Sequence, residues 1–369
     1  MTHTHIGVPA EVKNSEFRVS MTPAGAHALV SRGHRVDVES RAGESAGFHD
    51  DEYLSAGANI VDTADEAWAA ELILKVKEPI EKEYRFLHEN LTLFTFLHLA
   101  ADLPLTQAIL DSKATAIAYE TVQLPDHSLP LLTPMSEVAG RLAPQVGAVE
   151  LHASRGGRGV LLGGVPGTAP AKVLVIGGGV AGEQAAATAL GLGADVTVMD
   201  ISLPTLRELD ARYEHRIKTL ASSPYEVARQ VRDADLVIGA VLVPGAAAPK
   251  VVTDAMVSSM KRGAVLVDIA IDQGGCFEGS RPTTHSEPTF RVHDAIYYCV
   301  ANMPGAVPAT STPALTNATL PYVLEIADLG WQAALVRNAA LAKGLNAMTG
   351  NLINKGVADA HGLQLSVRS

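Results

Sequence analysis

The feature that most constrains the fold is a glycine-rich hexapeptide in the middle of the chain. Gly177, Gly179 and Gly182 form a G-x-G-x-x-G pattern that follows an apolar run at 172–176 and precedes a helix predicted at 180–192. A chain with 32 glycines produces such patterns by chance, so the strand-then-helix context gives this one its weight. The first glycine permits a tight turn, the second lets a pyrophosphate approach the backbone, and the third lets helix and strand pack closely. The pattern predicts a dinucleotide-binding turn at a helix N-terminus.

An aspartate at the end of the next predicted strand indicates which dinucleotide is bound. Asp200 lies 18 residues after Gly182 and closes the strand predicted at 195–199. A carboxylate there accepts hydrogen bonds from the adenosine ribose and repels a 2′-phosphate. The sequence therefore favours NAD over NADP. The alternative is a glycine turn of an ordinary α/β domain with an incidental aspartate.

Strands and helices alternate on both sides of this motif, which predicts an α/β fold. Apolar runs predict strands at 6–9, 35–38, 59–61, 72–76, 91–97, 115–119, 172–176, 195–199, 236–241, 265–270 and 296–300. Helices are predicted at 23–31, 50–56, 64–70, 103–112, 180–192, 224–231, 254–260, 315–329 and 332–343. Several strands are apolar on both faces, as expected for parallel strands covered by helices.

The 369 residues suffice for two Rossmann-like, doubly wound parallel-sheet domains. The last two helices are too few to form a domain, so we expect them to pack on the first part of the chain. This gives a discontinuous substrate domain, 1–130 plus 306–369, and an NAD-binding domain, 131–305. The active site is expected in the cleft between them.

Charge and cysteine content exclude several classes of function. Acidic residues (40) outnumber basic ones (29), and the resulting charge of -11 argues against nucleic-acid or anionic-membrane partners. Cys276 and Cys299 have no metal-ligand spacing, and no metal is expected. The longest uncharged stretch, 295–324, contains four prolines and is unsuited to a membrane helix. With no targeting segment recognised, we expect a cytoplasmic protein.

Four polar residues follow predicted strands and are candidates for chemistry: Arg18 after 6–9, Lys77 after 72–76, His98 after 91–97 and Asp272 after 265–270. Ligands of open parallel sheets bind outside the carboxyl ends of the strands, which is where all four are expected. The first three belong to the substrate domain and the fourth to the NAD-binding domain.

Each candidate has a plainer interpretation. Arg18 could be a solvated loop charge, His98 a satisfied core histidine between two leucines, and Asp272 a cap of the following glycine turn. Lys75 and Lys77 share a face of the predicted strand, where each ammonium would lower the proton affinity of the other. The G-x-S-x-G pattern at 43–47 resembles a hydrolase elbow but lacks the strand and helix that such an elbow needs.

Six segments resemble the bacterial L-alanine dehydrogenases: 14–19 (NSEFRV), 74–79 (LKVKEP), 94–99 (FTFLHL), 135–140 (MSEVAG), 268–284 (DIAIDQGGCFEGSRPTT) and 300–304 (VANMP). The resemblance covers nearly the whole chain and weakens in the last ~20 residues. It implies NAD-dependent oxidative deamination of L-alanine to pyruvate and ammonium, the reverse reductive amination, and a homohexamer.

The resemblance also implies roles for individual residues. Arg18 and Lys77 bind the substrate carboxylate and carbonyl, and His98 and Asp272 carry the acid–base work. The matching cofactor positions, beside Gly177, Gly179 and Gly182, are Ser136, Val180, Asp200, Ser222, Ile269, Asp272, Asn302 and Met303. The residues leave open which of His98 and Asp272 is the principal proton carrier.

Three other functions remain as alternatives. One is the NAD(H)-binding soluble subunit of a proton-translocating transhydrogenase, which shares the fold and the opening motif. A lysine-forming dehydrogenase would need a longer and more polar substrate pocket. A non-catalytic NAD-binding oligomer is the third.

Overall fold

The computed structural model describes residues 3–241 and 248–366, which form two compact units. The first unit consists of Met1–Met135 and Gly305–Ser369, and the second of Ser136–Pro304. The chain passes between them within helix α5 (Thr133–Glu150) and the short helix η7 (Met303–Ala306).

The first unit is built on an eight-stranded sheet in the order β15-β14-β6-β5-β4-β1-β2-β3. Its strands are β1 (His5–Val8), β2 (Arg35–Glu39), β3 (Asn59–Val61), β4 (Leu72–Leu74), β5 (Thr92–Thr95), β6 (Thr115–Ala118), β14 (Leu345–Met348) and β15 (Asn351–Leu352). The strands β1 to β6 are parallel, and β14 pairs antiparallel with both β6 and β15. The strand order reverses between β1 and β4, which makes that point the switch point of this sheet.

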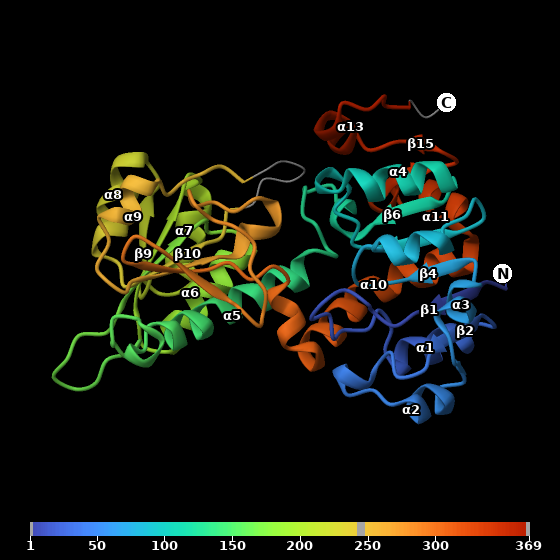
Figure 1. The fold of residues 1–369 in the computed structure, drawn as a ribbon, viewed down its shortest axis with the longest axis horizontal. Coiled ribbons are helices and arrows are strands. Elements are labelled where there is room, and N and C mark those ends of the chain that lie inside the picture. Colours follow the sequence, from blue (N-terminus) through green and yellow to red (C-terminus); the bar gives the residue numbers. More distant parts are fainter. Residues whose placement is uncertain (1–2, 242–247, 367–369) are drawn as a thin grey trace. The chain divides into compact units, whose positions relative to one another are not determined.

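Helices cover both faces of the first sheet (Figure 1). They are α1 (Pro23–Val30), α2 (Asp50–Ser55), α3 (Ala64–Trp68), α4 (Leu103–Ser112), α10 (Pro308–Leu329), α11 (Trp331–Arg337), α12 (Ala339–Ala342) and α13 (Lys355–His361). Trp68 of α3, Ile109 of α4 and Val357 of α13 join Ile73 and Leu93 of the strands in one buried cluster. The segment after residue 305 therefore completes both the sheet and the core of this unit.

The second unit has a seven-stranded sheet in the order β12-β13-β11-β10-β7-β8-β9. Its strands are β7 (Lys172–Ile176), β8 (Asp195–Asp200), β9 (Lys218–Ala221), β10 (Leu236–Gly239), β11 (Val265–Asp268), β12 (Thr289–Val292) and β13 (Ala295–Tyr298). All pairs are parallel except β12 with β13. The switch point lies between β7 and β10.

Alternate residues of the strands in the second unit enter two cores. Its helices, besides most of α5, are α6 (Val180–Gly191), α7 (Leu203–Arg212), α8 (Pro224–Asp233) and α9 (Asp254–Ser258). Val173 packs with Ala185 of α6 on one face, whereas Leu174 packs with Val227 of α8 on the other. Strands buried on both faces explain why the sequence there is almost continuously apolar.

The structure confirms the α/β fold class and corrects several predicted elements. The strands β4 and β5 are shorter than predicted, ending at Leu74 and Thr95 rather than at residues 76 and 97. Prediction missed α5, α7, α13, β9, β12, β14 and β15 and joined α11 and α12 into one helix. Helix α10 begins at Pro308, although the prolines before residue 315 had suggested a loop.

Helix α10 contains internal prolines, and two of its hydroxyl side chains bond to carbonyl groups of their own segment. Proline is favoured in a first helical turn, which Pro308 occupies, but Pro313 and Pro321 lie inside the helix. Ser311 Oγ donates to the carbonyl of Val307 at 3.0 Å, and Thr316 Oγ1 donates to the carbonyl of Pro313 at 3.4 Å. These hydroxyls bond back to carbonyl groups three or four residues earlier, as serine and threonine side chains in helices often do.

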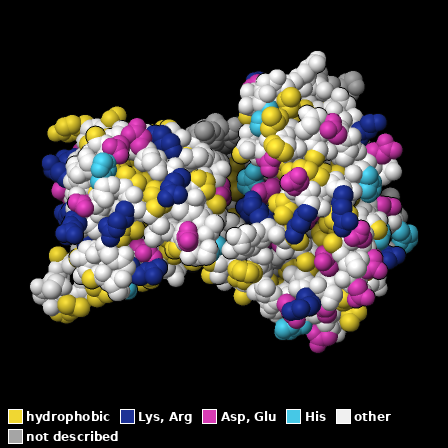
Figure 2. All heavy atoms as spheres, in the orientation of Figure 1, with side chains coloured by type: hydrophobic (Ala, Val, Ile, Leu, Met, Phe, Trp, Pro, Cys, Tyr) yellow, Lys and Arg dark blue, Asp and Glu magenta, His cyan; other side chains and the backbone are white. Residues whose placement is uncertain are grey.

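The surface charge is mixed. On the face drawn in Figure 2, acidic and basic side chains both occur on each unit. The net charge of -11 is therefore not gathered into one acidic surface on this face. Among the described residues, no helix is both long and apolar enough to cross a membrane.

Candidate active site

Three of the predicted site residues lie in loops that leave neighbouring strands of the first sheet. Arg18 follows β1, Lys77 follows β4 and His98 follows β5, and these strands are adjacent in the order β5-β4-β1. Because the strands are parallel, their carboxyl ends lie at one edge of the sheet, beside its switch point. The strands β4 and β5 end at Leu74 and Thr95, so two residues separate each strand end from the candidate residue.

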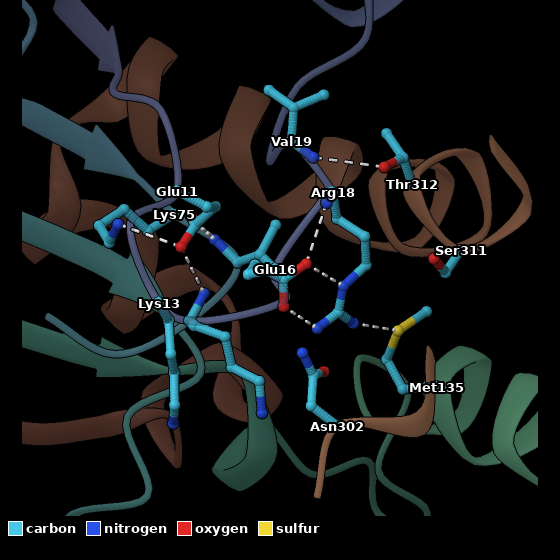
Figure 3. Close-up of polar contacts among 12 residues, drawn as sticks. Glu11, Lys13, Glu16, Arg18, Val19, Lys75, Met135, Asn302, Ser311 and Thr312 are labelled. Carbon is cyan, nitrogen blue, oxygen red and sulfur yellow. Dashed lines mark hydrogen bonds and ion pairs between the residues drawn. The ribbon is translucent and has the colours of Figure 1, made fainter. Parts of the chain in front are cut away.

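Arg18 is buried and held by a carboxylate from its own loop (Figure 3). Its Nε donates to Glu16 Oε1 at 2.7 Å and its Nη2 donates to Glu16 Oε2 at 2.5 Å. Nη1 lies 2.9 Å from Met135 Sδ, and the next amide, of Val19, donates to Thr312 Oγ1 at 3.3 Å. Glu16 therefore fixes the plane of the guanidinium along its Nε–Nη2 edge.

The two lysines of the 74–79 segment have different environments. Lys75 is fully buried, and its Nζ lies 3.1 Å from Glu11 Oε2 and 3.0 Å from Glu83 Oε1. Burial alone would lower the pKa of Lys75, but the two carboxylates outweigh burial and raise it. The expectation that the lysines depress one another is therefore wrong for Lys75, which is a structural cation.

The backbone of Lys77 is held by two hydrogen bonds, whereas its side chain forms none in the described part of the chain. Its amide donates to Glu11 Oε2 at 3.4 Å, and its carbonyl accepts from Thr95 Oγ1 at 3.2 Å. Only 6% of the residue is exposed, and Nζ has no hydrogen bond or ion pair among the described residues. A nearly buried ammonium without a partner is suited to receive an anionic or carbonyl ligand.

His98 lies in a turn with a left-handed backbone. Its backbone is left-handed, with φ of 50°, and its amide donates to Glu120 Oε1 at 2.6 Å. The ring stacks on Phe96 with centroids 5.9 Å apart, and 29% of the side chain is exposed. His98 is therefore half-buried, with one face of its ring against Phe96.

A carboxylate contacts the Nδ1 side of the His98 ring. Glu78 Oε2 lies 3.2 Å from His98 Nδ1, and Glu78 Oε1 forms an ion pair with Lys13 Nζ. Burial and the nearby charge of Lys77 oppose protonation of the imidazole. The hydrogen bond to Glu78 and the charge of Glu120 favour protonation more strongly, so the pKa of His98 is raised. Burial would also raise the pKa of Glu78, but His98, Lys77 and Lys13 hold it well below its usual range.

The second unit carries the glycine turn in the geometry that the motif predicts. Gly177 has φ of 100°, and a Cβ there would lie 2.6 Å from the carbonyl oxygen of Ala240. A Cβ on Gly182 would lie 1.7 Å from the oxygen of Gly177, so this position requires glycine. At Gly179, by contrast, a Cβ would meet nothing within 4 Å. The first and third glycines serve close packing, and the second borders open space in front of the α6 N-terminus.

The helix α6 begins without a side-chain cap. Its N-cap residue is Gly179, and Val180, which opens the helix, is 42% exposed. The amide groups of its first turn are therefore available to an anion, and the helix dipole favours one there.

Asp200 lies at the end of β8, beside this turn. Its Oδ2 accepts from the amide of Gly178 at 2.7 Å and its Oδ1 accepts from the amide of Ser202 at 2.7 Å. Its carbonyl accepts from the amide of Ser222 at 2.9 Å, which links the ends of β8 and β9. Each carboxylate oxygen keeps a further lone pair, so Asp200 can still accept hydrogen bonds from a ligand.

The turn after β11 carries Asp272 and is organised by a residue that sequence analysis missed. Asp268 is fully buried, accepts from the amide of Cys276 at 2.9 Å and from Ser280 Oγ at 2.6 Å, and caps the short helix η6 (Ile269–Gln273). Burial raises the pKa of Asp268, although these donors oppose the shift. Asp272 is exposed and Ile269 is half-buried. The turn is capped by Asp268, not by Asp272.

The remaining predicted cofactor positions lie at the two ends of the second unit. Ser136 is half-buried on α5, and Asn302 has a left-handed backbone with φ of 69° and a carbonyl 3.2 Å from His285 Nε2. Met303 belongs to the buried core, so its backbone rather than its side chain is the group available to a ligand.

Two family models match almost the whole chain. The model "Alanine dehydrogenase/PNT, N-terminal domain" matches residues 7–139, and "Alanine dehydrogenase/PNT, C-terminal domain" matches residues 143–355. The chain belongs to the alanine dehydrogenase/PNT family.

Members of this family resemble the chain over nearly their full length. The alanine dehydrogenase of Mycolicibacterium smegmatis is 61% identical over 96% of this chain and 95% of its own. A solved structure of L-alanine dehydrogenase superposes with a TM-score of 0.93 and 50% identity, covering 97% of this chain and 99% of that one. A transhydrogenase from Sinorhizobium meliloti is more distant, with a TM-score of 0.82 and 26% identity over 95% of this chain and all of that chain.

Sequence analysis identified the cations of the family's candidate site but not the carboxylates that hold them. Glu11, Glu16, Glu78 and Glu120 all lie in the loops or short helices that follow strands of the first sheet, and each binds a predicted site residue or its neighbour. Two of them had a signal in the sequence, since Glu16 and Glu78 lie within two residues of Arg18 and Lys77. Glu11 and Glu120 had none, because their partners are distant along the chain.

Proposed function

We propose that the chain is an NAD-dependent L-alanine dehydrogenase. It would catalyse L-alanine + NAD⁺ + H₂O ⇌ pyruvate + NH₄⁺ + NADH + H⁺ in both directions. The observation that carries the proposal is the group of Arg18, Lys77 and His98 at adjacent strand ends of the first unit. Relatives named alanine dehydrogenase, matched over nearly their full length, support it.

The second unit fits NAD as the hydride acceptor. The open space at Gly179, the uncapped start of α6 and the carboxylate of Asp200 are the features that a pyrophosphate and an adenosine ribose need. Ser136, Val180, Ser222, Ile269, Asn302 and Met303 complete the proposed set of cofactor contacts. When bound, NAD supplies the redox chemistry by accepting a hydride from the substrate Cα.

The substrate is held by the two cations of the first unit. Arg18 binds the substrate carboxylate, with Glu16 fixing the plane of the guanidinium. Lys77, which is nearly buried and whose Nζ forms no hydrogen bond or ion pair within residues 3–241 and 248–366, polarises the oxygen that becomes the carbonyl of pyruvate. These local charges attract anionic substrates in spite of the overall charge of -11.

Protons move because loss of hydride from L-alanine leaves an iminium, to which water must add before ammonia departs. His98 exchanges a proton with the attacking water or the leaving ammonia, and Asp272 balances the cationic intermediates. By family resemblance, the protein is also proposed to be a cytoplasmic homohexamer, and no nucleic-acid or membrane partner is expected.

Enzyme assays with NAD⁺ and L-alanine at alkaline pH test the proposal. NADH should accumulate, as followed by its near-ultraviolet absorbance, and D-alanine should give no signal. His98→Ala should lower kcat by roughly 10²–10⁴-fold while NADH binding, measured by fluorescence titration, survives. Loss of NADH binding in that variant would make His98 structural instead. Hydride exchange with a nucleotide analogue that depends on an added membrane fraction, without any alanine oxidation, would favour a transhydrogenase subunit.

A further inference from the structure

Two charged residues, Lys13 and Glu78, are linked to the proposed proton carrier His98. Lys13, in the loop after β1, forms an ion pair with Glu78, in the loop after β4, and Glu78 contacts Nδ1 of His98, in the turn after β5. Glu78 is 9% exposed, so water screens its interaction with the ring only weakly. None of the roles proposed above uses Glu78 or Lys13.

The surroundings of His98 leave its ring little freedom. The left-handed backbone is fixed by the hydrogen bond from its amide to Glu120, and the ring stacks on Phe96. With Nδ1 at 3.2 Å from a carboxylate oxygen, the neutral ring carries its proton on Nδ1. Nε2 then keeps its lone pair, and it has no hydrogen-bond partner among the described residues.

We propose that Glu78 is a positioning residue for His98. Building on the proposed dehydrogenase function, Glu78 orients the ring and fixes its tautomer, so that Nε2 alone exchanges the proton with the substrate. Its negative charge also raises the pH at which His98 loses its proton, and Lys13 limits this effect by neutralising part of that charge.

The charges that face His98 determine the sign of each effect. Glu78 and Glu120 stabilise the imidazolium, while Lys77 and burial oppose it. Glu78→Gln keeps an oxygen that can accept from Nδ1 but removes the charge, so the pKa of His98 should fall. Lys13→Met removes the cation that compensates Glu78, so the pKa of His98 should rise. If Glu78 and Lys13 only supported the fold, Glu78→Gln and Lys13→Met would not shift the pKa of His98 in opposite directions.

The test combines pH profiles with NMR titration of labelled histidine in the full-length protein. The His98 resonance is assigned as the one missing from His98→Ala. In Glu78→Gln, the acid limb of kcat/KM for L-alanine and the His98 titration should both move to lower pH, by about 1–3 units. In Lys13→Met, both should move to higher pH by a smaller amount. Glu81→Gln, an exposed carboxylate of the following short helix, is the matched control and should leave both unchanged.

The outcomes separate this inference from the proposed function. Opposite shifts of the His98 titration support the positioning role even if alanine is not oxidised, in which case the proposed function fails alone. Alanine oxidation with an unmoved titration in Glu78→Gln overturns the positioning role and leaves the function standing. If Glu78→Gln does not fold, Lys13→Met decides the matter, because an unchanged or lowered His98 pKa in that variant overturns the inference.

Discussion

Lys75 stabilises the first unit through charge pairing in a site that excludes water. Its ammonium lies between Glu11 and Glu83, and its side chain has no exposed surface. Lys75→Met should lower the free energy of unfolding of this unit by about 3–5 kcal/mol, because it leaves buried carboxylates without a counter-charge. Both tryptophans, Trp68 and Trp331, lie in the first unit, so the tryptophan fluorescence of urea-treated protein reports its unfolding.

The stability lost in Lys75→Met should be smaller at acidic pH. At acidic pH the unpaired carboxylates become protonated and neutral, so Lys75→Met should lose less stability there than at neutral pH. Lys82→Met, which removes an exposed lysine nearby, should be almost neutral at both pH values. Equal stability of Lys75→Met and Lys82→Met at neutral pH would show that the buried ion pairs contribute nothing.

At the scale of single residues, sequence reasoning predicted the positions of the candidate cations better than their environments. Arg18, Lys77 and His98 were predicted because parallel strands bring their carboxyl ends to one edge, a rule that needs no tertiary detail. Lys75 and Lys77 could not be told apart, since the predicted strand gave both the same face. The strand ends at Leu74 instead, and only the fold shows that two carboxylates from other loops enclose Lys75.

At the scale of an element, the turn from β7 into α6 contains one glycine required for packing, Gly182, and one that borders the proposed cofactor site, Gly179. Gly182→Ala should destabilise the second unit, because its Cβ would lie 1.7 Å from a carbonyl oxygen. Gly179→Ala should fold normally, since its φ of -69° suits alanine, but should weaken NADH binding by occupying the space in front of the helix. Thermal unfolding followed by circular dichroism and NADH fluorescence titration measure the two effects.

A third glycine of the same helix serves as the control. Gly191, the last residue of α6, has open space around a Cβ, so Gly191→Ala should stabilise the unit by up to about 1 kcal/mol without changing NADH affinity. Unchanged NADH affinity in Gly179→Ala would contradict the assignment of this turn to the cofactor.

Elements with a clear periodicity or cap were predicted well, and those stabilised by tertiary contacts were not. The helix after the glycine turn was placed to within one residue at its end. Helix α5 contains Pro144, and α10 contains two internal prolines, so local propensity argued against both helices. The strands β14 and β15 are short, and β14 exists because it pairs with β6, more than two hundred residues earlier.

At the scale of the whole molecule, the two units differ in how the chain builds them. The second unit is one continuous segment with its own sheet and two buried clusters. The first unit needs both ends of the chain, because β14 pairs with β6 and α13 enters the cluster formed by α3 and α4. Sequence reasoning anticipated that the tail returns to the first part of the chain, but it expected helices alone and not added strands.

This difference predicts how fragments of the protein behave. Residues 133–304, which keep α5 whole, should fold cooperatively and bind NADH, because their sheet, cores and glycine turn are all internal to the segment. Residues 1–132 should not fold alone, since the edge of β6 and the apolar surface under α10 and α13 would be exposed. Circular dichroism melting and NADH titration of the first fragment, and solubility of the second, test this. Co-expression with residues 305–369 should restore solubility to the second fragment. A soluble, cooperatively unfolding 1–132 fragment would mean that the returning tail adds to a finished fold instead of completing it.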